Sequence, residues 1–282
     1  MDNTLIALIG QIFISLYPIL IKRSNATLPQ QLAGRFGIFT LLPLILGGTS
    51  ILQSVFGSFD SVVKTLAAGA VNILHVFESY KSFQLLPAGP AYTIIYTYPF
   101  WNLIGARIFL GEAIPTAVLP LFLLAFIGIL LIASAVANGK QETNRRGLIA
   151  AFTGAITESI LFLIVRGSES MNPFENIGRL YIGAAGLLAT GTSIFSPNSI
   201  KEAIATPKDV PLFNALIGFT SMTALIWSAK RIPTFVYSLI AFIGLVASYG
   251  WGLLFANEVP SGRALLGSAI IGVSVLLLQS HV

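Results

Sequence analysis

The chain has 282 residues, of which 55% are hydrophobic and only 10% are charged, and its mean hydropathy is +0.84. A soluble domain of this length needs more polar surface than that, so the composition predicts an integral, multi-pass membrane protein. The net charge of +5 would suggest nucleic acid as the partner of a soluble protein, but here the Lys and Arg residues flank apolar runs, where they anchor helix ends, and no nucleic-acid partner is expected.

Apolar stretches follow one another along the whole chain, each with about the 17 to 25 residues that a membrane-crossing helix needs. Their apolar residues are continuous instead of alternating with polar ones, which predicts helices and not a β-barrel. The first stretch is interpreted as a span, because it lacks the basic start and the cleavage site of a signal peptide. The ten stretches are residues 4–21, 32–52, 62–80, 90–110, 115–137, 147–165, 177–195, 211–228, 233–256 and 259–279. We therefore expect an all-α membrane protein with ten transmembrane helices.

The two halves of the chain repeat one pattern at an offset of 144 to 146 residues. The pairs include Gly10 with Gly154, Arg35 with Arg179, Pro87 with Pro233, Glu112 with Glu258 and Gly128 with Gly272. A polar link at 138–146 lies near the middle of the chain, where a duplication junction should be, and predicts repeats at 1–141 and 142–282. Since each repeat would hold an odd number of spans, the sequence predicts two inverted five-helix repeats, an architecture typical of alternating-access transporters.

The best-defined part of this pattern resembles a known family. Residues 79–91 (SYKSFQLLPAGPA), Pro99, Leu110-Gly111-Glu112 and Ile127-Gly128-Ile129 are similar to the closing signature of an EamA-like repeat of the drug/metabolite transporter superfamily. The second half repeats the signature more loosely, so the resemblance covers essentially the whole chain. It departs from the family pattern where Leu245, beside Gly244, aligns with Pro99. The resemblance implies a carrier of amino acids, drugs, amines, sugar phosphates or nucleotide sugars.

Ionisable and amide side chains inside the apolar stretches are expected to mark a substrate path, because a charged group that faces lipid costs several kcal/mol. Glu158, near the centre of the sixth stretch, is predicted to balance the charge of a cationic substrate or to carry a coupling proton; the alternative is a hydrogen-bonded packing carboxyl. Asn72 and His75 share one face of the third stretch and are predicted to hydrogen-bond the substrate, unless His75 is a satisfied interhelical donor. His281 is the only other histidine, so no metal site and no cofactor are predicted.

Aromatic and basic residues complete the set of candidates. Tyr96 and Trp101, beside Pro99, are predicted to form a stacking wall for an organic cation or an amino acid, although Tyr and Trp also form interfacial belts. Arg35 and Arg179 occupy equivalent positions near the starts of their helices. Such residues commonly snorkel to headgroups; the alternative is two symmetry-related gates or anion contacts.

Together these features predict a secondary transporter that moves a small polar organic metabolite, such as an amino acid or an amine, by alternating access. Its partners would be that metabolite and the lipid bilayer, and the protein would be a monomer or a homodimer. The alternatives are a carrier of phosphorylated sugars or nucleotide sugars, a channel, and a membrane-embedded enzyme. The last two are disfavoured because no filter-like segment and no catalytic constellation are visible, and the chain has no cysteine nucleophile.

Overall fold

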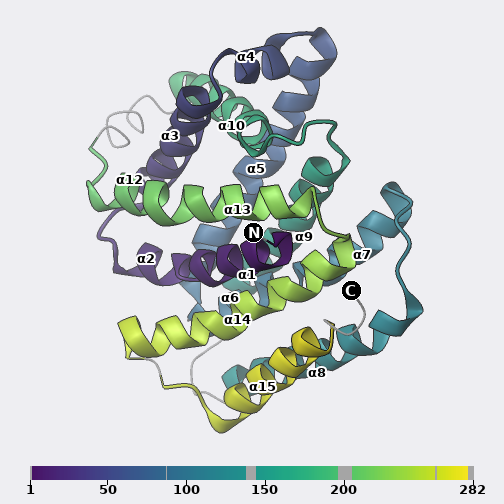
Figure 1. Ribbon diagram of the computed structural model, residues 1–282. Coiled ribbons are helices and arrows are strands. Elements are labelled where there is room, and N and C mark those ends of the chain that lie inside the picture. The colour runs from purple at the N-terminus through teal and green to yellow at the C-terminus, as the bar shows by residue number, and fades with distance from the viewer. Residues whose placement is uncertain (1, 87, 138–143, 196–204, 258, 279–282) are drawn as a thin grey trace.

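The computed structural model describes residues 2–86, 88–137, 144–195, 205–257 and 259–278, and within these ranges the chain forms helices and no strand (Figure 1). The first half contains α1 (Asn3–Ile14), α2 (Tyr17–Arg23), α3 (Leu28–Gly47), α4 (Thr49–Phe56), α5 (Phe59–Leu85), α6 (Ala88–Ile95), α7 (Tyr98–Phe109), η1 (Thr116–Val118) and α8 (Leu119–Ala137). The second half contains α9 (Arg145–Gly167), α10 (Pro173–Phe195), α12 (Asp209–Phe213), η2 (Asn214–Phe219), α13 (Thr220–Ala229), α14 (Thr234–Ala256) and α15 (Gly262–Leu278). The all-α prediction is confirmed for these ranges.

Several of these helices have the length and composition of membrane spans. Five segments are long and apolar enough: Asn3–Arg23, Thr116–Ser134, Arg145–Gly167, Asp209–Ala229 and Thr234–Ala256. A sixth is formed by α3 and α4 if this bent pair counts as one span. The count of ten spans stays a prediction. The predicted repeat boundary between 141 and 142, Pro87, Glu258 and His281 lie outside the described residues.

Two breaks interrupt stretches that the sequence predicts as single spans. The stretch at 32–52 is not one straight helix, because the chain bends by 114° between α3 and α4, at Gly48. Gly48 has a φ of +58°, in the left-handed region that side chains other than glycine rarely adopt. The stretch at 90–110 is also broken, beside Pro99: α6 ends at Ile95 and α7 begins at Tyr98, so the proline, which has no backbone N–H, lies in the first turn of α7.

The helices of the two halves interdigitate. α1 packs against α13 and α14, and α9 packs against α5 and α7 (Figure 1). α8 packs against α15 through two glycines: a Cβ on Gly128 would lie 2.7 Å from the carbonyl oxygen of Gly267, and one on Gly267 would lie 2.5 Å from that of Gly128. Small residues of this kind let membrane helices approach closely. Close packing matters there because the hydrophobic effect does little to drive helices together within a bilayer.

Candidate functional site

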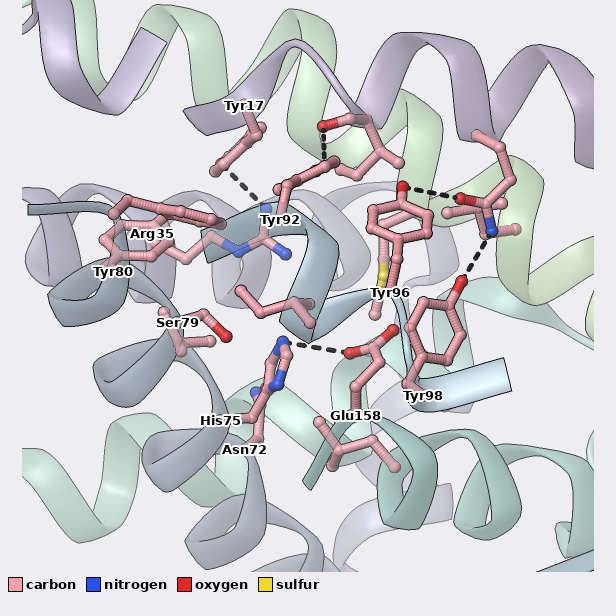
Figure 2. Close-up of a pocket in the computed structure, with 18 of the residues that line it drawn as sticks. Tyr17, Arg35, Asn72, His75, Ser79, Tyr80, Tyr92, Tyr96, Tyr98 and Glu158 are labelled. Atoms are coloured by element: carbon pink, nitrogen blue, oxygen red, sulfur yellow. Dashed lines mark hydrogen bonds and ion pairs between the residues drawn. The ribbon is translucent and has the colours of Figure 1, made fainter. Parts of the chain in front are cut away.

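A cavity of about 110 Å³ lies in the middle of the bundle, where helices of both halves meet (Figure 2). We call it the central cavity. Its polar and aromatic lining comes from α1, α2, α3, α5, α6, α7, α9 and α10. The residues concerned are Gln11, Tyr17, Arg35, Asn72, His75, Ser79, Tyr80, Tyr92, Tyr96, Tyr98, Glu158 and Tyr181.

His75 of α5 and Glu158 of α9 form an ion pair in this lining, with 3.0 Å between Nε2 and Oε2. The other ring nitrogen, Nδ1, lies 3.1 Å from the carbonyl oxygen of Gly154. A carbonyl only accepts hydrogen bonds, so Nδ1 carries a hydrogen. The Thr157 hydroxyl does not donate to Nδ1, because it donates to the Thr153 carbonyl at 2.7 Å. The contact between Nε2 and Oε2 joins α5 to α9 through an imidazole and a carboxyl group, two groups that can share a proton.

Asn72 and Ser79 lie on the same helix as His75 and contribute hydrogen-bonding atoms that the protein leaves unused. The Asn72 side chain is fully buried and its amide nitrogen donates to the Leu180 carbonyl at 3.2 Å. Its Oδ1 and the Ser79 Oγ are buried and have no partner among the described residues. A buried acceptor without a partner costs about 1–3 kcal/mol, so a ligand that donates to these oxygens would gain affinity.

Three tyrosines form one wall of the central cavity: Tyr92 of α6, Tyr96 between α6 and α7, and Tyr98 of α7. The ring centroids are 4.7 Å apart between Tyr92 and Tyr96 and 5.6 Å apart between Tyr96 and Tyr98. Gln11 of α1 fixes this wall, because its Oε1 accepts from the Tyr96 hydroxyl at 3.2 Å and its Nε2 donates to the Tyr98 oxygen at 3.0 Å. Gly244 makes room for Tyr96: a Cβ at that position would lie 2.1 Å from the hydroxyl. The departure from the family pattern beside Leu245 thus coincides with a glycine that the wall requires.

Arg35 points into the protein, and its guanidinium lies among aromatic rings and not at the membrane surface (Figure 2). It is 7% exposed, and its Cζ lies 3.6 Å from the centroid of Phe39. Nη1 donates to the Tyr17 hydroxyl at 2.8 Å, and Nε donates to the Tyr181 hydroxyl at 2.9 Å. None of the ion pairs in the described ranges includes Arg35. Its charge is therefore stabilised by neutral hydroxyls and ring faces, without a carboxylate.

A π-helical segment, η2, supports this arginine from the second half of the chain. Asn214 accepts a hydrogen bond from the Tyr17 hydroxyl, and a Cβ on Gly218 would lie 2.8 Å from Nη1 of Arg35. Segments of π-helix often occur at functional sites, since they re-aim side chains within a helix. The segment thus provides both a partner for Tyr17 and the space for the guanidinium.

The central cavity brings together most of the predicted site residues. Asn72, His75, Tyr96, Glu158 and Arg35 all line it. Trp101 does not: its side chain is 36% exposed and its ring meets Phe152 edge-on, with 6.2 Å between centroids. Arg179 lies elsewhere, in a second cavity described below. The sequence did not single out Gln11, Tyr17 and Tyr181, although a polar or aromatic residue inside an apolar stretch is the signal that would have suggested them.

At the end of the bundle where α7 and α9 finish and α14 begins, Arg166 connects the two halves. Its Nε donates to Glu112 Oε1 at 2.7 Å, and its Nη1 donates to the carbonyls of Ala229 and Ile232 at 2.5 and 2.9 Å. The other oxygen of Glu112 accepts from the backbone N–H of Thr234 at 3.4 Å. Burial alone would raise the pKa of the Glu112 carboxyl, but the hydrogen bonds from Arg166 and Thr234 and the Arg166 charge lower it below its usual value. We call this group the Arg166 lock.

Lys230 extends the Arg166 lock on the α13 side. Its Nζ donates to the carbonyl of Arg166 at 3.0 Å and to that of Ser168. Burial lowers the pKa of Lys230, and the neighbouring charges of Arg166 and Arg231 lower it further. Backbone carbonyls accept hydrogen bonds from Arg166 and Lys230, and Glu112 is the carboxylate that pairs with Arg166, so the loss of this carboxylate should be costly.

The substitution Glu112→Gln is expected to lower the free energy of unfolding at pH 7 by about 1–3 kcal/mol, because it removes the charged acceptor of Arg166 and Thr234. A carboxyl whose pKa is lowered on folding contributes stability that is present above its usual pKa and is lost as the pH falls through the folded value. The difference in melting temperature between wild type and variant, measured in detergent, should thus be large at pH 7 and smaller at about pH 4, just below the usual pKa of a glutamate. Asp60→Asn is the control, since Asp60 forms a solvent-exposed pair with Lys64. An equal difference at both pH values would contradict this role of Glu112.

Comparisons with known proteins place the chain among membrane transporters. No family model matches it. The pseudopaline exporter CntI of Pseudomonas aeruginosa, in strains UCBPP-PA14 and PAO1, is 26% identical over 285 aligned positions, which cover 99% of this chain and 96% of the relative. One solved crystal structure shares the fold, with a TM-score of 0.72 at 17% identity over 97% of this chain and 96% of its own. With the apolar helices, the likeness to exporters shows that the chain is an integral, multi-pass membrane protein and confirms that it is not an enzyme.

Proposed function

We propose that this chain is a secondary transporter of the drug/metabolite transporter superfamily that exports a small zwitterionic metabolite by alternating access. The single observation that carries the proposal is the central cavity, in which the His75–Glu158 pair lines the same space as a buried arginine that has no carboxylate partner among the described residues. Export is proposed because the relatives similar over nearly the whole chain are named as exporters. Pseudopaline, the compound in the name of these relatives, is the first one to test.

Helix packing supports the inverted-repeat part of the proposal. In two repeats offset by about 144 residues, α9 would correspond to α1, and α13 to part of α5. The helices pair accordingly, since α1 packs against α13 and α9 packs against α5. Individual contacts correspond as well: a Cβ on Gly10 would lie 3.1 Å from Leu225, and a Cβ on Gly154 would lie 2.8 Å from Ser79. Gly154 and Leu225 are the residues that the offsets of 144 and 146 assign to Gly10 and Ser79. A pseudo-two-fold relation accounts for both contacts at once.

The charges of the central cavity favour a zwitterion over a phosphorylated sugar. Arg35 is the one Lys or Arg among the described residues that line the cavity, and Glu158 is the one carboxylate. A single guanidinium matches one carboxylate group, whereas a phosphate dianion usually recruits several donors or cations. Glu158 and the free Oδ1 of Asn72 are acceptors, suited to an ammonium or another N–H group. An amino-acid-like compound presents both kinds of group.

The proton of the His75–Glu158 pair suggests how transport is driven. An ammonium group of the substrate that approaches Glu158 competes with imidazolium for the same carboxylate, so binding of the substrate would release the proton through neutral His75. Outward movement of the substrate would then be exchanged for inward movement of a proton. At about 110 Å³ the cavity is smaller than the roughly 300 Å³ or more of ordinary ligand sites, so the substrate has to widen it.

Flux through the purified protein in liposomes tests this function. Pseudopaline and a panel of amino acids, amines and sugar phosphates are offered in a counterflow assay, in which external label enters against unlabelled compound inside. We expect saturable exchange of a zwitterion, accelerated by an opposing proton gradient. Exchange of sugar phosphates but not of zwitterions would overturn the substrate class, and flux that never saturates would indicate a channel. Empty liposomes provide the background.

A further inference from the structure

A second cavity, of about 470 Å³, lies next to the Arg166 lock and is independent of the central cavity. We call it the outer cavity. It lies where α5 and α10 begin and α9 ends. Its polar lining consists of Asp60, Lys64, Ser168, Glu169, Asn176 and Arg179. The side chains of Asp60 and Lys64 are 70% and 71% exposed, so the mouth of the cavity is open to solvent.

Most polar groups of the outer cavity already have hydrogen-bond or ion-pair partners within the protein, but one nitrogen of Arg179 has none among the described residues. Lys64 pairs with Asp60 at 2.6 Å, and the Asn176 amide donates to the carbonyls of Ser170 and Asn172 at 3.0 and 3.1 Å. The Nε of Arg179 is buried and has no hydrogen-bond partner among the described residues, and Arg179 is in none of their ion pairs. This guanidinium is therefore available to an external anion.

The outer cavity lies close to the central cavity, because three helices, α5, α9 and α10, line both. To the outer and the central cavity respectively, α5 contributes Ala68 and Asn72, α9 contributes Val165 and Leu161, and α10 contributes Leu180 and Tyr181. Ala68 and Asn72 are one helical turn apart, which is about 6 Å along the axis. The barrier between the cavities includes the hydrogen bond from Asn72 to the Leu180 carbonyl. A separation of α5 and α10 at this hydrogen bond would join the two cavities.

We propose that the outer cavity is a second binding station on the transport path, where Arg179 holds the anionic group of the substrate on its way to or from Arg35. This inference rests on the proposed function for the identity of the cargo, but the anion site itself follows from the outer cavity alone. The two arginines then act in sequence on one carboxylate. Arg179 sits at the solvent-open station, and Arg35 sits in the enclosed one.

The chain contains no cysteine, so a single introduced thiol reports on the outer cavity without background. Ala67→Cys places that thiol in the lining. Its reaction rates are measured with two methanethiosulfonate reagents, the anionic sulfonatoethyl and the cationic trimethylammonioethyl compound. Adding Arg179→Gln should lower the ratio of anionic to cationic rate by about fivefold, as expected for a partly exposed charge. Lys64→Gln is the matched control and should lower the ratio less, because Asp60 already offsets the charge of Lys64.

A second readout links the outer cavity to transport. Complete modification of Ala67→Cys by the sulfonatoethyl reagent should block pseudopaline flux in liposomes, because the attached group fills the station and occupies Arg179. An unchanged rate ratio in the Arg179→Gln background, or full flux after modification, would overturn the proposal. If the unmodified wild type carries neither pseudopaline nor another zwitterion, the proposed function fails instead, and the rate ratio still decides whether Arg179 forms an anion site.

Discussion

The substitution Glu158→Gln is expected to reduce proton-driven flux of the substrate by about 30- to 100-fold and to remove its pH dependence. This factor corresponds to the loss of about 2–3 kcal/mol from one charge-assisted contact in a desolvated site. Glutamine has nearly the same shape as glutamate, and its amide can donate to Nε2 of His75 while Nδ1 still donates to the Gly154 carbonyl. The variant therefore keeps the hydrogen bond between α5 and α9 and loses only the carboxylate and its proton.

Two measurements separate this effect from misfolding. Flux is measured with a proton gradient and in counterflow without one, at several values between about pH 6 and pH 8. Glu78→Gln serves as the matched control, since Glu78 lies on α5 beside Ser79 but does not line the central cavity. Its Oε1 lies 4.0 Å from Nζ of Lys81. The control should behave like wild type. Wild-type pH dependence in Glu158→Gln would show that the His75–Glu158 pair does not carry the coupling proton.

Glu158 and His75 could be singled out from the sequence because of an energetic rule. An ionisable group inside an apolar stretch is expensive unless it faces the protein interior, so each residue was a candidate on its own. Their pairing could not be predicted, because it depends on the register of α5 against α9. That register is set by close packing, in which a Cβ on Gly154 would meet the Ser79 side chain. Residues more than 80 positions apart are brought together by the shapes of the packed side chains, and a hydropathy pattern does not describe those shapes.

The two arginines show where the repeat argument falls short. Equivalent positions predicted similar roles for Arg35 and Arg179, but the aromatic partners of Arg35 are Tyr17, Phe39 and Tyr181. The residues that an offset of 144 assigns to these partners are Leu161, Gly183 and Gly37. Arg179 therefore has no counterpart of the aromatic cage and remains near the solvent. Comparing the neighbours of each arginine, and not the arginines alone, would have predicted this difference.

Trp101 and Gly48 illustrate two further limits. Trp101 follows Tyr96 by five residues, which is about 140° around a helix, so it leaves the face of Tyr96 even before the break at Pro99 is considered. The bend at Gly48 lies inside an apolar stretch, and hydropathy does not report the backbone angle that turns the chain there. The fold class, the apolar segments and the Pro99 break follow from local composition. The cavity geometry follows from contacts between halves.

The substitution Arg35→Gln is expected to weaken the apparent affinity for a carboxylate-bearing substrate by about 100-fold, equivalent to roughly 3 kcal/mol, because a buried guanidinium is a strong partner for a carboxylate. The carboxamide derivative of the same compound should be affected much less, since it has no negative charge to lose. Thermal stability should remain the same or rise. In the described ranges Arg35 has no counter-ion, and removing a buried charge that lacks a counter-ion relieves its desolvation cost.

Conservative variants at the same place separate charge from geometry. Arg35→Lys keeps the positive charge but cannot bond Tyr17 and Tyr181 at once through a planar group, so it should retain part of the discrimination between carboxylate and carboxamide. Tyr181→Phe removes one acceptor of the guanidinium and leaves its charge in place, and it should change the affinity only a few-fold. If Arg35→Gln weakened both forms of the substrate equally and also lowered the melting temperature, Arg35 would be a packing residue and the central cavity would need another anion partner. Loss of carboxylate affinity in a protein at least as stable as wild type is the result that only a binding role produces.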